Sequence, residues 1–217
     1  MDMTGYRNHV SKHRGTCTRF LLMTILLNSA LVGCFGSMPH TLVSDYGNMG
    51  IRRIAVLPVS DQAGCNDVLG IIREETVNEL YFKGYAKVSL KDMDEKLLTV
   101  YPASILQHAE QMPPGAIGQL LGVDAVMYIT LNQYKNKIHF LYASTSLAVS
   151  FELRSVDTGM TLWQTSCGMT ERNYDFTKKE LDMKTVMVFE TVVQQVVDKA
   201  MATLPEGLGS KLDKPVK

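Results

Sequence analysis

The sequence predicts one α/β domain of the α+β kind, a single mixed β-sheet with flanking helices in the order β-α-β-α-α-β-β-β-α. Three stretches carry this prediction. Residues 123–134 are almost wholly apolar, residues 142–166 alternate apolar and polar side chains around a turn, and residues 178–204 repeat apolar side chains at helical spacing. A chain of 217 residues with 46% hydrophobic side chains is long enough for one well-buried domain and too short for two large ones.

The first strand and the first helix follow from residues 51–84. The sequence "IRRIAVLPV" (51–59) indicates a short buried strand that Pro58 closes. Asn66 or Asp67 can then cap a helix whose apolar side chains fall on one side and which ends at Gly84. This stretch supplies the first β-α pair.

Three short elements are expected next along the chain. "AKVSL" (86–90) has the composition of a second short strand. Asp92 and Glu95 have the spacing of a capping box at the start of a short helix. Residues 113–121 begin with two prolines and are followed by Gly122, a pattern that predicts one or two further helical turns.

The remaining strands and the last helix have the clearest periodicity. Residues 123–134 are typical of a strand buried on both faces. The chain alternates from Tyr142 onward, and the turn Asp157-Thr158-Gly159 joins this strand to a returning one, which predicts a hairpin. Apolar side chains of residues 178–204 lie at three- and four-residue steps before Pro205, as in a long amphipathic helix.

The N-terminal segment has the three-part layout of a secretory signal. Residues 1–19 are polar and basic, and residues 20–33 are mostly apolar and end in small side chains. An apolar run of this length falls short of the roughly 20 residues that a transmembrane helix needs. Leu31-Val32-Gly33-Cys34 resembles the lipobox of bacterial lipoproteins.

The lipobox resemblance implies a covalent lipid anchor on Cys34. The signal would be cut between Gly33 and Cys34, with diacylglycerol on the thiol and an acyl chain such as palmitate on the new amino group. Two or three buried chains hold a protein on a membrane durably, whereas one holds it marginally. Phe35 stands where an aspartate would favour the inner membrane, so the expected location is the periplasmic face of the outer membrane of a Gram-negative bacterium. The alternatives are a secreted protein cut elsewhere and a buried Cys34.

These readings divide the chain into four parts. Residues 1–33 are the signal peptide, and residues 34–50 are the lipidated cysteine and a flexible tether, because residues 35–50 show no period and are rich in Gly, Ser, Pro and Asn. Residues 51–204 form the α/β domain. Residues 205–217 are expected to be a flexible tail, because they have little to bury.

Three blocks of the domain resemble a known family. These are "IAVLPV" (54–59), "MPPGAIGQLLGVDAVMYITLNQY" (112–134) and "SFELRSVDTGMTLWQ" (150–164). They are similar to a family of bacterial lipoproteins of unknown function that includes a meningococcal vaccine-candidate lipoprotein. The Asp-Thr-Gly-x-x-Leu-Trp turn also resembles the curli-secretion lipoprotein and the N-terminal domain of the Tol-Pal translocation protein. The resemblance implies a small mixed sheet with helices and a role in envelope assembly or protein contact, with no catalytic apparatus to transfer.

No pattern for nucleotide, metal or nucleophilic chemistry is found in the sequence. His40, His108 and His139 are widely separated and have no Cys or carboxylate at ligand spacing, so no metal site is expected. Glu74 and Glu75 are about 100° apart around a helix axis and are best explained as a solvated face. We therefore assign no catalytic residue, and no cofactor beyond the lipid on Cys34.

Cys65 and Cys167 are the two remaining thiols of the processed chain. In an oxidising periplasm they can pair, and closing a loop of about 100 residues would stabilise the fold by up to ~4.7 kcal/mol in the chain-entropy model. The alternative is two separate thiols, because pairing requires Cα atoms within about 7 Å. A disulfide between Cys65 and Cys167 is therefore one of two options.

Charge narrows the class of partner. The four basic side chains of residues 1–33 leave the rest of the chain with a net charge of −3, which gives no electrostatic reason to bind nucleic acid. Besides membrane lipid held through the anchor, partners can be a second copy of the chain in a homo-oligomer, other envelope lipoproteins or periplasmic proteins. An open sheet edge could accept a strand from such a partner.

The leading functional hypothesis is a non-enzymatic lipoprotein that acts in cell-envelope assembly or transport through protein contacts. Asp61, Asp67 and Asp124 lie near predicted strand or helix ends, where sites of α/β folds often form. The first alternative is an envelope hydrolase with a site at strand ends near Asp61 and Asp124. Helix capping or loop hydrogen bonding explains those carboxylates at least as well. The second alternative is a soluble periplasmic ligand-binding module.

Overall fold

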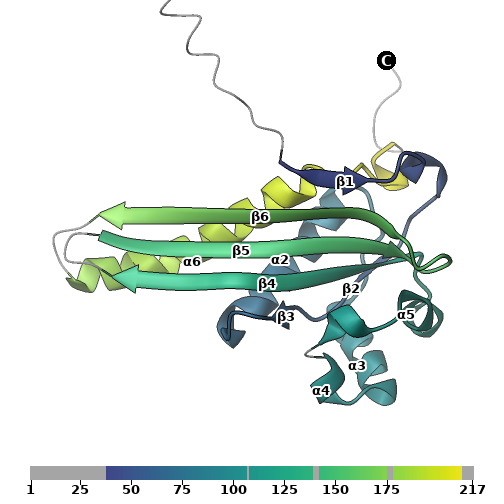
Figure 1. The fold of residues 1–217 in the computed structure, drawn as a ribbon, viewed down its shortest axis with the longest axis horizontal. Helices are drawn as coiled ribbons and strands as arrows, with labels where there is room; N and C mark the ends of the chain where they lie inside the picture. Colours follow the sequence, from purple (N-terminus) through teal and green to yellow (C-terminus); the bar gives the residue numbers. More distant parts are fainter. Residues whose placement is uncertain (1–37, 107, 139–141, 175–177, 212–217) are drawn as a thin grey trace, which may run out of the picture. The chain divides into compact units, whose positions relative to one another are not determined.

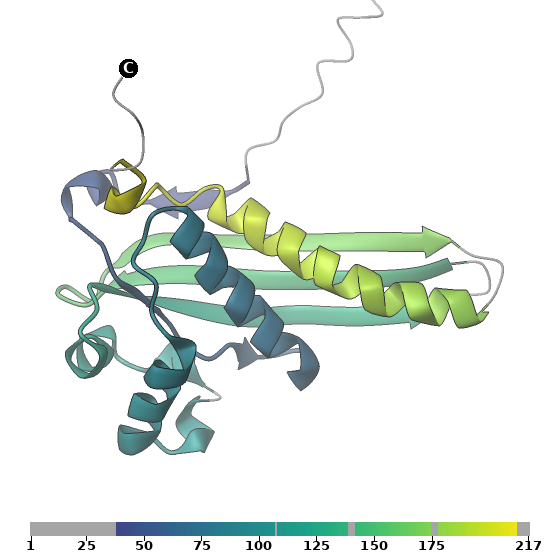
Figure 2. The ribbon, with the colours of Figure 1, turned by 180° about the vertical axis from the view of Figure 1, so that it is seen from behind.

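The sheet of the computed structural model has six strands, and the two longest helices cover one of its faces (Figures 1 and 2). The structure describes residues 38–106, 108–138, 142–174 and 178–211. Its strands are β1 (His40–Leu42), β2 (Ile54–Val56), β3 (Ser60–Asp61), β4 (Ala125–Ile138), β5 (Tyr142–Ser155) and β6 (Thr161–Tyr174). The α-helices are α2 (Leu69–Phe82), α3 (Leu90–Val100), α4 (Ala103–Leu106), α5 (Pro114–Leu121) and α6 (Lys178–Met201), with 3-10 turns at Tyr46–Asn48, Asn66–Val68, Ala109–Gln111 and Leu208–Lys211.

The sheet is mixed, which confirms the predicted fold class. Its strand order is β1-β6-β5-β4-β2, and β3 also pairs with β4. The long strands β4, β5 and β6 are antiparallel neighbours, β1 is antiparallel to β6, and β2 and β3 run parallel to β4. The hairpin that the alternating pattern predicts is the β5–β6 pair.

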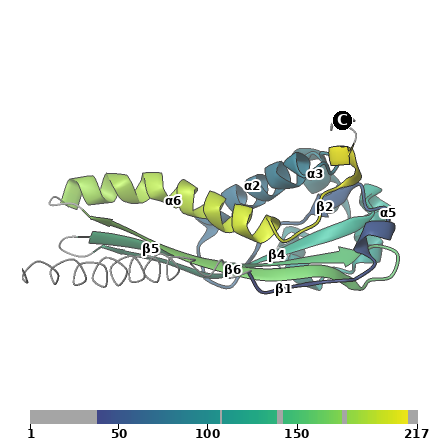
Figure 3. The same cartoon turned by 90° about the horizontal axis from the view of Figure 1, so that it is seen from above.

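Two hydrophobic cores hold the helices to the sheet. The first lies between the sheet and the helices α2 and α6, which cover the same face (Figure 3). The second lies at the β2 end, where α3 and α5 pack against β2 and β4. Strand β2 serves both cores, because Ile54 and Val56 belong to the first, while Ala55 and the next residue after the strand, Leu57, belong to the second.

The predicted second strand at residues 86–90 is wrong. Only one isolated parallel bridge, between Arg53 and Ala86, forms there. The chain turns into α3 at once, because the side chain of Ser89 caps that helix by accepting from the backbone N–H of Asp92. The capping box predicted from Asp92 and Glu95 is therefore replaced by a cap three residues earlier.

The start of α2 also differs from the prediction. Residues Asn66–Val68 form a 3-10 turn, and the α-helix begins at Leu69 with Val68 at the N-cap and no side-chain cap hydrogen bond. The helix stop at Gly122 is as predicted, because that residue ends α5 with a φ of 67°, a conformation that glycine adopts without steric strain.

Residues 38–50, which the sequence assigned to a flexible tether, belong to the folded unit that begins at Met38. Strand β1 pairs with Trp163–Thr165 of β6, and the Tyr46 side chain is buried. The Tyr46 hydroxyl donates to that of Tyr85 at 2.7 Å, and Tyr85 donates to the carbonyl oxygen of Pro205 at 2.9 Å. This segment is ordered by backbone pairing and one buried aromatic ring, which local composition does not reveal.

The described part of the C-terminal tail, residues 205–211, is also packed rather than flexible. The backbone N–H groups of Gly207 and Gly209 donate to the carbonyl oxygens of Lys83 and Gly84 at 2.8 and 3.1 Å. A β-carbon at Gly207 would lie 2.8 Å from the carbonyl carbon of Gly84, so the two backbones approach as closely as glycine allows.

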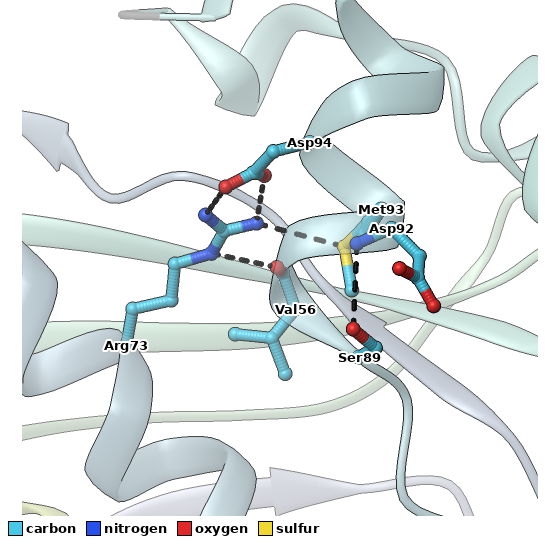
Figure 4. Close-up of polar contacts among 6 residues, drawn as sticks. All are labelled: Val56, Arg73, Ser89, Asp92, Met93 and Asp94. Carbon is cyan, nitrogen blue, oxygen red and sulfur yellow. Dashed lines mark hydrogen bonds and ion pairs between the residues drawn. The ribbon is translucent and has the colours of Figure 1, made fainter.

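Arg73 of α2 joins three elements at the junction of the two cores (Figure 4). Its Nε donates to the carbonyl oxygen of Val56 at 3.0 Å, and its terminal nitrogens donate to both carboxylate oxygens of Asp94 on α3 at 2.7 and 2.8 Å. The Arg73 side chain is 10% exposed, and that of Asp94 is 39% exposed. A bidentate pair of this kind fixes both distance and orientation, so it sets how α3 lies against α2 and β2.

Replacing Asp94 by alanine is expected to lower the free energy of unfolding by about 1–3 kcal/mol, because the mostly buried guanidinium of Arg73 loses its charged partner. Urea unfolding followed by circular dichroism measures this change. The matched control is Glu95→Ala on the same helix, whose exposed pair with Lys91 spans 4.0 Å. That control is expected to change stability by less than about 0.5 kcal/mol. Equal effects of the two substitutions would contradict the assignment.

Candidate binding surface on the open face of the sheet

Outside the second core, the face of β4, β5 and β6 that lies opposite α2 and α6 is polar, and we call this part the open face (Figure 3). Along β5 every second side chain is buried against the helices, and the side chains between them are half-buried. The half-buried set, which defines the central line of the open face, consists of Tyr142, Ser144, Ser146, Ala148, Ser150, Glu152 and Arg154. Most of these side chains are small or carry a hydroxyl, so this line along β5 suits contact with water or a polar ligand.

A β-bulge in β4 sets which side chains reach the distal part of the open face. The register between β4 and β5 shifts between Leu131 and Gln133. After that shift Lys135 lies beside Ser146 and Lys137 beside Ser144. Without the extra residue both lysines would alternate to the helix-covered face.

The distal part of the open face is a groove with a basic rim, which we call the basic groove. Two cross-strand rows define it: Lys135, Ser146 and Thr170 in one, and Lys137, Ser144 and Arg172 in the other. The small serines of β5 lie between larger side chains of β4 and β6, and this difference in size leaves a trough of about 460 Å³. Its lining residues are Lys135, Lys137, Tyr142, Ser144, Ser146, Thr170 and Arg172.

A second groove of about 490 Å³ lies nearer to β1, and we call it the proximal groove. It is lined by Pro39, His40, Thr41, Ser150, Phe151, Glu152, Gln164, Thr165 and Ser166. The Glu152 carboxylate in its wall accepts from Arg154 at 2.7 Å and from the Thr161 hydroxyl at 2.6 Å. The Arg154 guanidinium lies 4.6 Å from the centre of the Tyr128 ring, a cation–π contact.

This cluster shifts the pKa values of its own members. The hydrogen bond from Arg154 holds the pKa of Glu152 below its ordinary value, despite partial burial. Burial raises the pKa of Tyr128 to about 12. Both groups are therefore held in the charge state that they already have at neutral pH, so neither is tuned to exchange a proton there.

The carboxylates proposed for a hydrolase do not form one site. Asp61 accepts from the backbone N–H groups of Ala63, Gly64 and Cys65 at 2.6–2.8 Å, and it closes the loop after β3. Asp124 accepts from the N–H groups of Arg52 and Arg53 at 3.0 and 2.8 Å. Asp61 lies beside Leu131 on β4, seven residues from Asp124, and seven residues of strand span roughly 23 Å. Loop and strand-end hydrogen bonding therefore accounts for both carboxylates.

The other sequence-predicted positions are distributed as follows. Cys65 and Cys167 are both free thiols in the structure, and the pKa of Cys167 is raised by burial. His40 lies within hydrogen-bonding distance of the carbonyl oxygen of Met38, at 2.9 Å, and His108 lies 3.8 Å from Glu110. Among the described residues no group of three or more metal-ligating side chains occurs. Gly33, Cys34 and His139 lie outside the residues that the structure describes.

Lys135, Lys137 and Arg172 did not stand out in the sequence. They come from two strands that are more than 30 positions apart along the chain, and only the bulge and the hairpin register bring them onto one face. The available signal was the serine alternation at residues 144–150, which marks a polar strand face.

Comparison with models of protein families identifies the family of this chain. Residues 55–206 match the model of the GNA1162-like lipoprotein family. The chain belongs to this family. The match confirms the family resemblance, and it makes the chain a member of a lipoprotein family. A search of curated proteins gives no match.

Solved structures that resemble this chain include the following three. Lipoprotein GNA1162 from Neisseria meningitidis is 21% identical, with 65% of this chain and 97% of that chain covered and a TM-score of 0.49. The PelC dodecamer from Paraburkholderia phytofirmans is 13% identical, with 79% and 100% covered and a TM-score of 0.49. The LpoB C-terminal domain from Salmonella enterica is 16% identical, with 68% and 94% covered and a TM-score of 0.41.

The hydrogen-bonded carboxylate of Glu152 predicts a specific pH dependence. A lowered pKa in the folded state adds stability above the ordinary glutamate value of 4.5, and this contribution is lost as the pH falls below that value toward the lowered one. In the Glu152→Gln variant the free energy of unfolding is therefore expected to fall less steeply between pH 5 and pH 3 than in the unmodified protein. Urea unfolding at a series of pH values measures the slope. Glu95→Gln on exposed α3 is the control, and a profile equally flattened in that variant would contradict the role of Glu152.

Proposed function

We propose that the protein is a non-enzymatic lipoprotein of the cell envelope, anchored by lipid on Cys34 to the periplasmic face of the outer membrane. It acts in envelope assembly or transport through protein contacts. Membership of the lipoprotein family supports the anchor, together with the lipobox at Leu31–Cys34. None of the helices in the described part of the chain is both long enough and apolar enough to span a membrane.

The folded unit begins close to the proposed anchor. Met38 is its first residue, only four positions after Cys34. Even a fully extended chain covers about 14 Å over four residues, so the domain is held near the membrane surface and not on a long stalk. The short link favours partners that are themselves at or near the membrane.

The free edge of β6 is the observation that carries the protein-contact part of the proposal. Strand β6 runs to Tyr174, but β1 pairs with its outer side only at Trp163–Thr165. Over residues 166–174 no described strand continues the sheet on that side. An edge of nine residues that no described strand covers is a template for strand addition by another chain.

Substituting Cys34 by serine is expected to abolish lipid attachment and to release the protein from the membrane fraction. Metabolic labelling with a radioactive or clickable palmitate analogue, followed by fractionation, measures both effects. Cys65→Ser is the matched control and is expected to keep the label and the membrane location. Persistent labelling of the Cys34→Ser protein would disprove the anchor.

A photo-crosslinking amino acid at Ser166, which is exposed on β6, is expected to capture a protein partner in intact cells. The control position is Leu98, which is 54% exposed on α3, away from the sheet edge. Mass spectrometry of the adduct distinguishes a second copy of this chain from a different protein. Crosslinks of equal yield at both positions, or none at Ser166, would refute a contact through the edge of β6.

A further inference from the structure

We propose that the basic groove binds the phosphate of an anionic phospholipid headgroup in the membrane that holds the anchor. This inference rests on the proposed function in one respect: the lipid anchor determines which membrane lies near the groove. It adds a second contact between the protein and the bilayer, made by the sheet itself.

The charge of the groove fits a phosphate group. Among the residues that the structure describes, Lys135, Lys137 and Arg172 are the charged side chains that line it, and none of the described lining residues is a carboxylate. The neighbouring acid, Glu171, pairs with Thr145 and therefore alternates to the opposite face of the sheet. Three cations around one trough repel each other, so an anion placed among them relieves that repulsion.

Hydrogen-bond donors in the floor match the oxygens of the same ligand. Ser146 and Thr170 lie within 2.9 Å of each other, so one hydroxyl proton between them serves that bond and the other is available to an acceptor. Ser144 adds a third hydroxyl between Lys137 and Arg172. Phosphate oxygens accept from ammonium, guanidinium and hydroxyl groups alike, which is the combination that this groove presents.

The aromatic rings at the groove end suit the membrane–water interface. The rings of Tyr142 and Tyr174 are 5.9 Å apart, and Tyr174 is 67% exposed. Tyrosines are enriched at headgroup depth, where the ring meets acyl chains and the hydroxyl stays wet.

The anchor and the groove can reach the same membrane. Pro39 and His40, which follow Met38 at once, line the proximal groove on the open face. The basic groove lies on the same face six residues further along β5, from Ser150 to Ser144, which is roughly 20 Å. A bilayer that receives the lipid near Met38 can therefore also contact the cationic end of the sheet.

The test uses the mature chain, residues 34–217 with Cys34→Ser, so that no lipid anchor contributes to binding. This chain contains the whole compact unit and both cores. Its binding is measured by flotation with vesicles of phosphatidylglycerol mixed with phosphatidylcholine, with vesicles of phosphatidylcholine alone, and with inorganic phosphate as a competitor.

The triple variant Lys135→Gln, Lys137→Gln and Arg172→Gln is expected to bind phosphatidylglycerol vesicles roughly 100-fold more weakly at low salt. The matched control removes three exposed cations elsewhere, with Lys87→Gln, Lys91→Gln and Lys96→Gln, and is expected to lose less than about threefold. A second triple variant keeps the charge, with Lys135→Arg, Lys137→Arg and Arg172→Lys, and is expected to retain binding.

The proposal is overturned if the chain without the triple substitution does not bind vesicles, or if it binds equally well to phosphatidylcholine alone. It is also overturned if the control variant loses as much binding as the glutamine variant, or if the chain binds inorganic phosphate but not the vesicles. If the glutamine variant does not fold, the salt dependence of vesicle binding by the unmodified and charge-retaining chains takes its place. Binding that added salt does not weaken would overturn the proposal. Failure here leaves the labelling of Cys34 unaffected, so the two proposals fail separately.

Discussion

The contact of Arg73 with Val56 and Asp94 is the constraint around which the two cores are arranged. Strand β2 has only three residues, all buried, and it divides its side chains between both cores. A short strand at a sheet edge leaves polar backbone groups in apolar surroundings unless another element supplies donors. Arg73 supplies one to Val56, and its charge in turn requires the carboxylate of Asp94. The positions of α2 and α3 follow from these two needs.

Because the helices are held on one face and at the β2 edge, most of the opposite face of β4–β6 is left without a cover. That face is stable in water because most of the open-face side chains on its central strand are polar: three serines, one glutamate and one arginine beside Tyr142 and Ala148. The small size of these β5 side chains also produces the grooves, because they lie between larger side chains on β4 and β6. Surface polarity and hollow shape thus have one origin in the alternation of β5.

The sequence predicted what long, periodic segments determine. β4, β5, β6 and α6 were foreseen because each has 14 or more residues whose period is set by which side is buried. Residues 86–90 failed because their apolar content serves a helix start at Ser89 and a single bridge. The ordered segments at residues 38–50 and 205–211 are held by backbone contacts with distant residues, such as Gly207 on Lys83, which leave no local signal. The basic groove depends on the register shift after Leu131, which no local pattern of residue types specifies.

The hydroxyl relay from Tyr46 through Tyr85 to Pro205 explains why the folded unit reaches so close to the proposed anchor. Burial raises the pKa of both tyrosines, so each stays a neutral donor, and an unpaired hydroxyl at this depth would be costly. The relay therefore ties the chain before β2, the turn after α2 and the chain after α6 to one another. Loosening any one of the three leaves a buried oxygen or hydroxyl without its partner. The segment that enters the folded unit and the segment that leaves it are thereby fixed together.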